Sequence, residues 1–232
     1  MRLWLQRKGR ERHRIKRAGF WRNHPGRWRF NVVRKEVEVL AVGGYLLDQF
    51  LQNGTNLRTD AYGGSVENRA RLLLEVVEAV TEIFGPNGVA VRLSPGGVFN
   101  GISDSNPQAI FDYVAAALNR FGLAYLHIIE PRVKGGQTLH AGQPPVAAAG
   151  LRKIFKGPII AAGGFDREGA IKIVENGDAD LVAFGRQFIS NPDLPERLRL
   201  GIPFNPYNRA TFYSAGPEGY IDYPSHSSST ME

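Results

Sequence analysis

The chain has 232 residues, 43% of them apolar and 27 of them glycine, which is enough for one sizeable domain with a hydrophobic core. It has no cysteine, which excludes disulfides and thiolate metal ligands and fits the reducing cytoplasm that we expect as its location. The net charge of +7 raises the question of a polyanionic partner, while the absence of any run of about 18 apolar residues argues against a membrane span.

The first 36 residues differ in composition from the remainder. Residues 1–35 hold 13 Lys and Arg against one acid, a net +12, whereas residues 36–232 hold 16 against 21, a net −5. The segment 1–36 has no sustained apolar period and breaks at Pro25 and Gly26, so we expect it to be disordered and foreign to the fold that follows. The alternative is a non-catalytic protein whose basic arm binds nucleic acid or another polyanion, which we consider the less favoured function.

From about residue 37 the chain alternates short apolar strands with amphipathic helices. This alternation is typical of an α/β fold in which parallel strands are covered by helices. The strands are predicted at Val37–Leu40, Val89–Ser94, Ala124–Glu130, Pro158–Ala162 and Ala179–Phe184.

Two helices carry clear start signals. One is expected to follow a Ser65 cap and to end near Phe84, before a glycine and a proline. The other is expected to use Asn106 as its cap and Pro107 in its first turn. Further helices are predicted after the pair Asn191 and Pro192, and at Pro145–Phe155 and Arg167–Asn176.

A buried arginine is expected on the strand VAVRLSP. The larger apolar side chains of this strand alternate with Arg92, so the arginine projects from the opposite, inner face of the sheet. It needs an acceptor there. A carboxylate of a neighbouring strand or an anionic or carbonyl-bearing ligand would both satisfy it, and the sequence leaves the two open.

The last two predicted strands end in glycine, as AAGGF at 161–165 and AFGRQF at 183–188. Adjacent glycine-rich strand ends allow backbone amides to approach a phosphate closely, and they are equally compatible with two ordinary tight turns. The G-x-G-x-x-G dinucleotide pattern is absent from both.

A series of motifs resembles the Old Yellow Enzyme family. The motifs are GYLLDQFL at 44–51, RTDAYGGSVENRARLLLEVV at 58–77, VRLSP at 91–95, IIEPR at 128–132, AAGGF, GDADLVAFGRQFISNPDLPERLRLG at 177–201 and NRATFY at 208–213. The resemblance implies an α/β fold of the (β/α)8 TIM-barrel type, here reduced to about strands four to eight in a domain at 37–224, with a flexible tail at 225–232.

The resemblance also implies a cofactor, a substrate class and a set of site residues. The family carries non-covalent FMN, takes electrons from NAD(P)H and reduces the C=C bond of small α,β-unsaturated carbonyl compounds. It implies that Arg92 contacts the flavin ring, that Tyr45 donates a proton to the substrate, and that Arg132 lies near the substrate mouth. The residues matching those that hold the FMN phosphate are Gly163, Gly164, Gly185 and Arg186.

The chain departs from the family pattern just before Tyr45. It reads VEVLAVGGY from Val37, with Leu40 where the family has His and Gly43 where the family has Asn or His. Both donors that polarise the substrate carbonyl are therefore lost, and no segment before Val37 resembles the first three βα units of the barrel. We expect impaired catalysis, with self-association through open barrel edges as an alternative.

Histidine and metal chemistry are not expected at the site. His127 lies within a strand and is predicted to be structural, and the other histidines have no metal-like spacing, so no metal site is predicted.

Overall fold

The structure is a computed structural model, and it describes residues 36–134, 137–139, 147–214 and 216–226. The predictions of a disordered basic segment at 1–36 and of a flexible tail at 225–232 fall almost wholly outside the described residues. The start of the helix predicted from Pro145 falls outside them as well.

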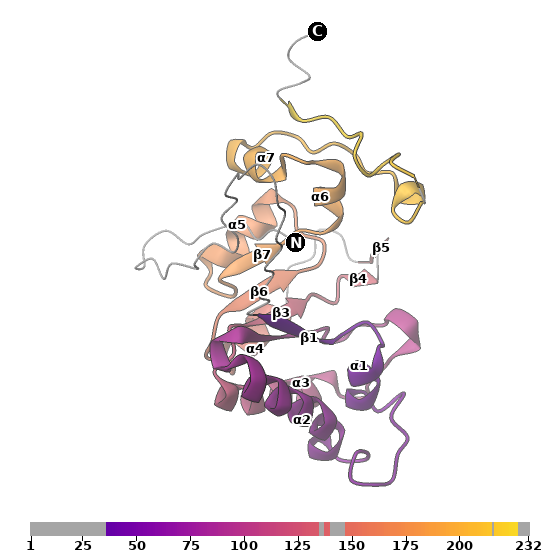
Figure 1. Cartoon of the computed structure of the whole chain (residues 1–232), viewed down its shortest axis with the longest axis vertical. Helices are drawn as coiled ribbons and strands as arrows, with labels where there is room; N and C mark the ends of the chain where they lie inside the picture. Colours follow the sequence, from indigo (N-terminus) through magenta and orange to yellow (C-terminus); the bar gives the residue numbers. More distant parts are fainter. Residues whose placement is uncertain (1–35, 135–136, 140–146, 215, 227–232) are drawn as a thin grey trace, which may run out of the picture.

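Five parallel strands form one open sheet with the order β1-β2-β3-β6-β7 (Figure 1). All five predicted strands are confirmed, with ends that differ from the prediction by at most two residues. A smaller antiparallel pair, β4 with β5, follows β3. The strands are β1 Val37–Ala41, β2 Val89–Leu93, β3 Tyr125–Ile129, β4 Val133–Lys134, β5 Gln137–Thr138, β6 Ile159–Ala162 and β7 Leu181–Ala183.

The two faces of the sheet have different environments because side chains alternate along each strand. One face packs under the helices and forms the main core, to which Val91 and Ile128 belong. The opposite face carries polar groups. Leu40 on β1 is in register with Arg92 on β2, which is in register with His127 on β3, so these three side chains share that inner face.

The two longest helices begin where their caps predict. The Ser65 hydroxyl accepts from the Asn68 amide at 3.3 Å ahead of α2, and the Asn106 side chain accepts from the Ala109 amide at 3.2 Å ahead of α3. In Figure 1 both helices lie beside the β1 end of the sheet, and α5, α6 and α7 lie at the β7 end. The α-helices are α1 Leu46–Leu51, α2 Val66–Phe84, α3 Pro107–Leu118, α4 Ala147–Arg152, α5 Arg167–Glu175, α6 Arg186–Ser190 and α7 Leu194–Leu200; short 3-10 turns are η1 Pro86–Gly88, η2 Phe99–Gly101, η3 Asn119–Phe121 and η4 Arg209–Thr211.

The helix predicted after Asn191 begins later than expected. Its cap residue is Asp193, and α7 starts at Leu194. Asn191 is fully buried instead, and its side chain donates to the Gln187 carbonyl at 2.8 Å and accepts from the Asn205 amide at 2.7 Å. The asparagine that looked like a cap therefore joins the end of α6 to the C-terminal segment, a long-range role that the local pattern does not reveal.

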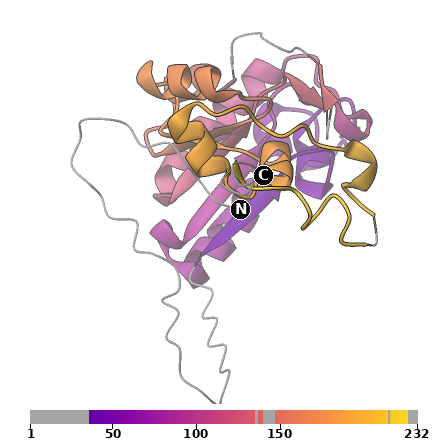
Figure 2. The same ribbon diagram turned by 90° about the horizontal axis from the view of Figure 1, so that it is seen from above.

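The C-terminal segment after α7 is mostly irregular and runs along the outside of the molecule (Figure 2). Hydrogen bonds hold it there. The Asn205 side chain donates to the Pro224 carbonyl at 2.8 Å, and the Asn208 amide donates to the Tyr223 hydroxyl at 2.8 Å. Among the described residues, no helix is long and apolar enough to cross a membrane.

Candidate functional site

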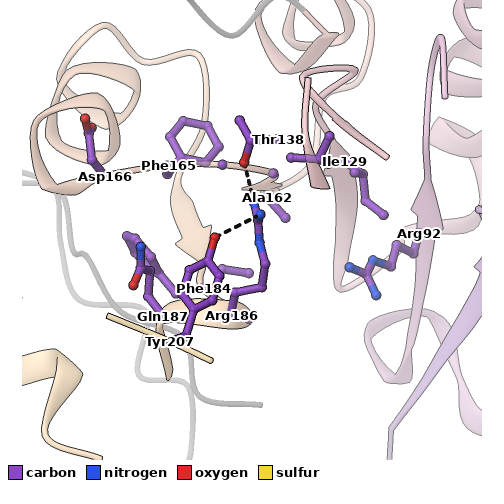
Figure 3. A pocket seen from close by; sticks show the side chains of 15 residues that line it. Arg92, Ile129, Thr138, Ala162, Phe165, Asp166, Phe184, Arg186, Gln187 and Tyr207 are labelled. Atoms are coloured by element: carbon purple, nitrogen blue, oxygen red, sulfur yellow. Dashed lines mark hydrogen bonds between the residues drawn. The ribbon is translucent and has the colours of Figure 1, made fainter. Parts of the chain in front are cut away.

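A cavity of about 410 Å³ opens where the carboxyl ends of β6 and β7 lie side by side (Figure 3). Ligands in parallel α/β folds bind at this end of the strands. Both glycine-rich turns predicted from the sequence contribute to its wall. The cavity residues that belong to the predicted site are Arg92, Gly163, Gly164, Gly185 and Arg186.

The turn between β6 and α5 requires its two glycines. Gly163 has φ +105° and Gly164 has φ +70°, both in the region that favours glycine. A Cβ atom on Gly163 would lie 3.1 Å from the amide nitrogen and 3.2 Å from the carbonyl oxygen of Glu130. The turn therefore packs closely against the end of β3 and presents backbone, without side chains, to the cavity.

Arg186 extends across the cavity from the start of α6. Its Nη2 donates to the Thr138 hydroxyl at 3.0 Å, and its Nη1 donates to the Tyr207 hydroxyl at 3.4 Å (Figure 3). Thr138 comes from the β4–β5 hairpin and Tyr207 from the C-terminal segment. Neither residue was predicted for the site, because the contact depends on packing between distant segments and no local motif signals it.

Arg92 enters the same cavity from β2 and points toward the space that Arg186 borders (Figure 3). Burial lowers its pKa, although the charges of Glu38 and Tyr125 act against that shift. Its buried Nε has no hydrogen-bond partner among the described residues. The sequence left two acceptors open for Arg92, a carboxylate of a neighbouring strand and a ligand. The structure has the carboxylate of Glu38 on β1 and a cavity in which a ligand could lie.

The carboxylate in question is held by a histidine. His127 is buried, and its Nδ1 lies 3.0 Å from Glu38 Oε2. Burial disfavours the charged form of Glu38, but the hydrogen bond and charge of His127, with help from Tyr125 and Arg92, hold its pKa below the usual value. His127 therefore contacts Glu38 on the inner face, and its structural role stays a prediction.

Tyr45 lies apart from the residues that line the cavity. It precedes α1 at the carboxyl end of β1, and its side chain is 56% exposed. The turn before it is well held, because the Gly43 amide donates to Ser94 Oγ at 3.2 Å and the Gly44 amide donates to Asp48 Oδ2 at 2.9 Å. Burial raises the pKa of Asp48, in spite of the hydrogen bonds that its carboxylate accepts.

Arg132 was expected near the substrate mouth, and the structure places it behind the glycine turn. Its side chain is buried, and its Nη2 donates to the Gly163 carbonyl at 2.8 Å. Its guanidinium carbon lies 4.6 Å from the centre of the Phe165 ring. Arg132 is not among the residues that line the cavity, whereas Gly163 and Phe165, which it contacts, do line it.

The chemistry of the cavity suits an anionic group of nucleotide size. Two guanidinium groups and two glycine turns surround a volume within the range of about 300–1,000 Å³ that is common for ligand pockets. The Nε of Arg92, which is buried and has no partner among the described residues, also favours an anionic or carbonyl-bearing ligand. Among the described residues, no cluster of His, Asp and Glu could hold a metal ion.

Comparison with known sequences identifies relatives of this arrangement. Residues 35–205 match the family described as the NADH:flavin oxidoreductase / NADH oxidase family. Putative 12-oxophytodienoate reductase 11 of Oryza sativa subsp. japonica is 50% identical over 190 residues, which cover 81% of this chain and 51% of that protein. 12-oxophytodienoate reductase 2 of Arabidopsis thaliana is 47% identical, with 82% and 50% covered.

Solved structures give the same picture. Morphinone reductase superposes with a TM-score of 0.74 at 48% identity, covering 82% of this chain and 50% of that one. The Old Yellow Enzyme homologue from Zymomonas mobilis superposes with a TM-score of 0.75 at 39% identity, covering 82% and 53%. The prediction of a partial (β/α)8 barrel is confirmed, and the chain spans about half the length of the relatives that it matches.

Proposed function

Because this chain belongs to the NADH:flavin oxidoreductase / NADH oxidase family, the Old Yellow Enzyme family predicted from its motifs, we propose that it binds FMN in the cavity beside β6 and β7. We further propose an NAD(P)H-dependent reduction of the C=C bond of small α,β-unsaturated carbonyl compounds. The observation that carries the proposal is that Arg92, Gly164 and Arg186 border one cavity.

The phosphate of FMN would be held by the backbone amides of the two glycine turns and by the guanidinium of Arg186. Backbone amides at strand-to-helix turns and a planar guanidinium are both well suited to phosphate oxygens. Arg92 would face the flavin ring, where a cation favours negative charge on the ring. When bound, the flavin would supply hydride transfer between NAD(P)H and the alkene.

Tyr45 would hold the proton that the substrate receives at its α-carbon. Its exposure is consistent with access to a substrate, but the residues that should polarise the carbonyl are replaced by Leu40 and Gly43. Neither leucine nor the missing side chain of glycine donates a hydrogen bond there. We therefore propose that the chain reduces enones slowly even when it retains the flavin.

Location and assembly are also part of this proposal. We expect a cytoplasmic protein. We also propose that copies of the chain can associate through the outer edges of β1 and β7, because each of these strands has a neighbour on only one side in the described sheet and its other edge can pair with another chain. The alternative function, a basic arm that binds nucleic acid, is not favoured by the relatives, and its residues lie outside the described part of the chain.

The test is a titration of the purified full chain with FMN, followed by flavin fluorescence and by gel filtration. We expect saturable binding, and an affinity at least about tenfold weaker for Arg186→Met, because a charge-assisted hydrogen bond to phosphate contributes about 1.5–3 kcal/mol. Arg120→Met is the control, since Arg120 is exposed and stacks on Phe121 away from the cavity.

A protein that stays colourless and does not alter FMN fluorescence would contradict the proposal. Enone-dependent NADPH oxidation at the rate of full-length relatives would contradict the claim of impairment.

A further inference from the structure

The peptide bond between Gly163 and Gly164 has one polar group on each side of the cavity wall. A trans peptide unit is planar, and its carbonyl and N–H point in opposite directions. The Gly163 carbonyl accepts from Arg132, which does not line the cavity, whereas Gly164 does line it. Among the residues that the structure describes, none accepts a hydrogen bond from the Gly164 amide. Because the Gly163 carbonyl is directed at Arg132, the Gly164 N–H of the same peptide is directed away from Arg132.

The turn has no side chains that could fix this orientation from within. Two consecutive glycines with positive φ have more backbone freedom than any other pair, so the peptide between them rotates unless an outside contact holds it. One outside contact is with the residue that follows β3, because the Glu130 backbone lies against Gly163. Arg132 follows two residues later and adds the hydrogen bond.

Arg132 is itself held in place. Its side chain is only 7% exposed, and its guanidinium lies against the Phe165 ring at 4.6 Å. Phe165 is buried and directly follows Gly164, so one arginine contacts the turn on both sides of Gly164. A charged donor to a carbonyl is also stronger than a neutral one.

We propose that Arg132 is a positioning residue that aims the Gly164 N–H into the cavity and so makes the site selective for a ligand with a terminal phosphate. This inference rests on the proposed function, because it concerns how the same cavity recognises FMN. It differs from a direct contact at the substrate mouth, since Arg132 acts through the peptide that it holds.

The chain contains a matched control. Like Arg132, Arg152 donates from its guanidinium to a glycine carbonyl, that of Gly157 at 3.0 Å. In addition, Arg152 forms an ion pair with Asp180. Gly157 lies just before β6 and Gly163 just after it, so the two arginines hold opposite ends of the same strand. Arg152→Met therefore removes a similar contact away from the cavity.

The first measurement is the affinity of the full chain for FMN and for riboflavin, which has the same ring without the phosphate. We expect Arg132→Met to weaken FMN binding at least about tenfold while riboflavin binding changes by less than about threefold. Arg132→Lys keeps the charge and loses the flat guanidinium, so its affinity for FMN should lie between those of the wild type and Arg132→Met. Arg152→Met should leave the ratio of the two affinities unchanged. A ratio for Arg132→Met equal to that of the wild type would overturn the inference.

The second measurement is hydrogen–deuterium exchange of the free protein, which needs no ligand. We expect faster exchange of the Glu130 amide, which donates to the Ala162 carbonyl at 2.9 Å beside the turn, for Arg132→Met, and a smaller increase for Arg132→Lys. Unchanged exchange there, or an increase spread over the whole sheet, would overturn the inference even if FMN binds. If the wild type binds no FMN, the proposed function fails, and exchange alone decides whether Arg132 orders the turn.

Discussion

The β6–β7 edge and the β1 edge of the sheet place their predicted site residues in different environments. At the β6–β7 side, five predicted residues border one cavity, and three of them are glycines. At the β1 side, Tyr45 is 56% exposed and Leu40 is 43% exposed, and neither borders that cavity. A site for an anion can be built from two neighbouring turns, whereas a proton-donor site depends on particular side chains, and we propose that Leu40 and Gly43 stand in place of two of them.

The largest effect is expected from returning the missing donors on the β1 side. Leu40→His with Gly43→Asn should raise enone reduction by about a hundredfold, because one preorganised donor to a developing oxyanion contributes about 2.7–4 kcal/mol. Gly43 has φ +65°, which asparagine tolerates, and a Cβ there would meet Phe99 and Tyr45 at an ordinary 3.7 Å.

The measurement is enone-dependent NADPH oxidation with saturating FMN. Adding Tyr45→Phe to the double variant should remove most of the gain if Tyr45 supplies the proton. No gain in the double variant, with flavin bound and the fold intact, would show that the β1 side lacks more than these two donors.

A smaller effect should follow from closing the glycine turn on the β6 side. Gly163→Ala places a methyl group against the Glu130 backbone and forces alanine to φ +105°, so stability should fall by about 1–3 kcal/mol and FMN binding should weaken. Gly101→Ala has a comparable φ of +74° with nothing within 4 Å, and it isolates the backbone strain from the collision.

Thermal unfolding and FMN titration of both variants make the comparison. If Gly163→Ala and Gly101→Ala lose equal stability and keep equal FMN affinity, the close packing of the turn against the end of β3 contributes neither to stability nor to FMN binding.

The smallest effect concerns the inner face that joins the two sides. The pKa of Glu38 is below its ordinary 4.5 in the folded chain, so its contribution to stability is present above pH 4.5 and is lost as the pH falls below it. Glu38→Gln should therefore cost about 1 kcal/mol near pH 7 and progressively less in acid. The groups that face this carboxylate are His127, Tyr125 and Arg92.

Urea unfolding between pH 3 and pH 7 would measure this difference. Glu36→Gln, at an exposed residue two positions earlier, should show no comparable trend. A cost for Glu38→Gln that stays constant with pH would mean that the ionised carboxylate is not what stabilises the inner face.

The sheet, its longest helices and the glycine turns follow from local patterns. Short apolar runs between helical segments predict each strand, and the Ser65 and Asn106 caps predict two helix starts that the structure confirms. The two-residue strands of the β4–β5 hairpin are too short to produce any periodic signal.

The rest of the site depends on contacts between distant segments. Thr138 and Tyr207 reach Arg186 from elements that are 48 and 21 residues away in the chain. Asn191 is another example. It resembles a helix cap in sequence, but in the structure its side chain accepts a hydrogen bond from the Asn205 amide. The burial of Arg132 is likewise invisible in a motif, since an arginine after a proline in a loop is most often solvated.

The location of both glycine turns within one stretch of chain has a consequence for how such a site can be inherited. Residues 159–186 contain β6, α5, β7 and the start of α6, so both glycine turns and Arg186 are encoded in a single short segment. Recombination or engineering near β1 could exchange Tyr45 and its surroundings while both glycine turns stay unchanged. A graft of the segment into another barrel would also need the residues that meet it from elsewhere in the chain, which are Arg92, Arg132, Thr138 and Tyr207.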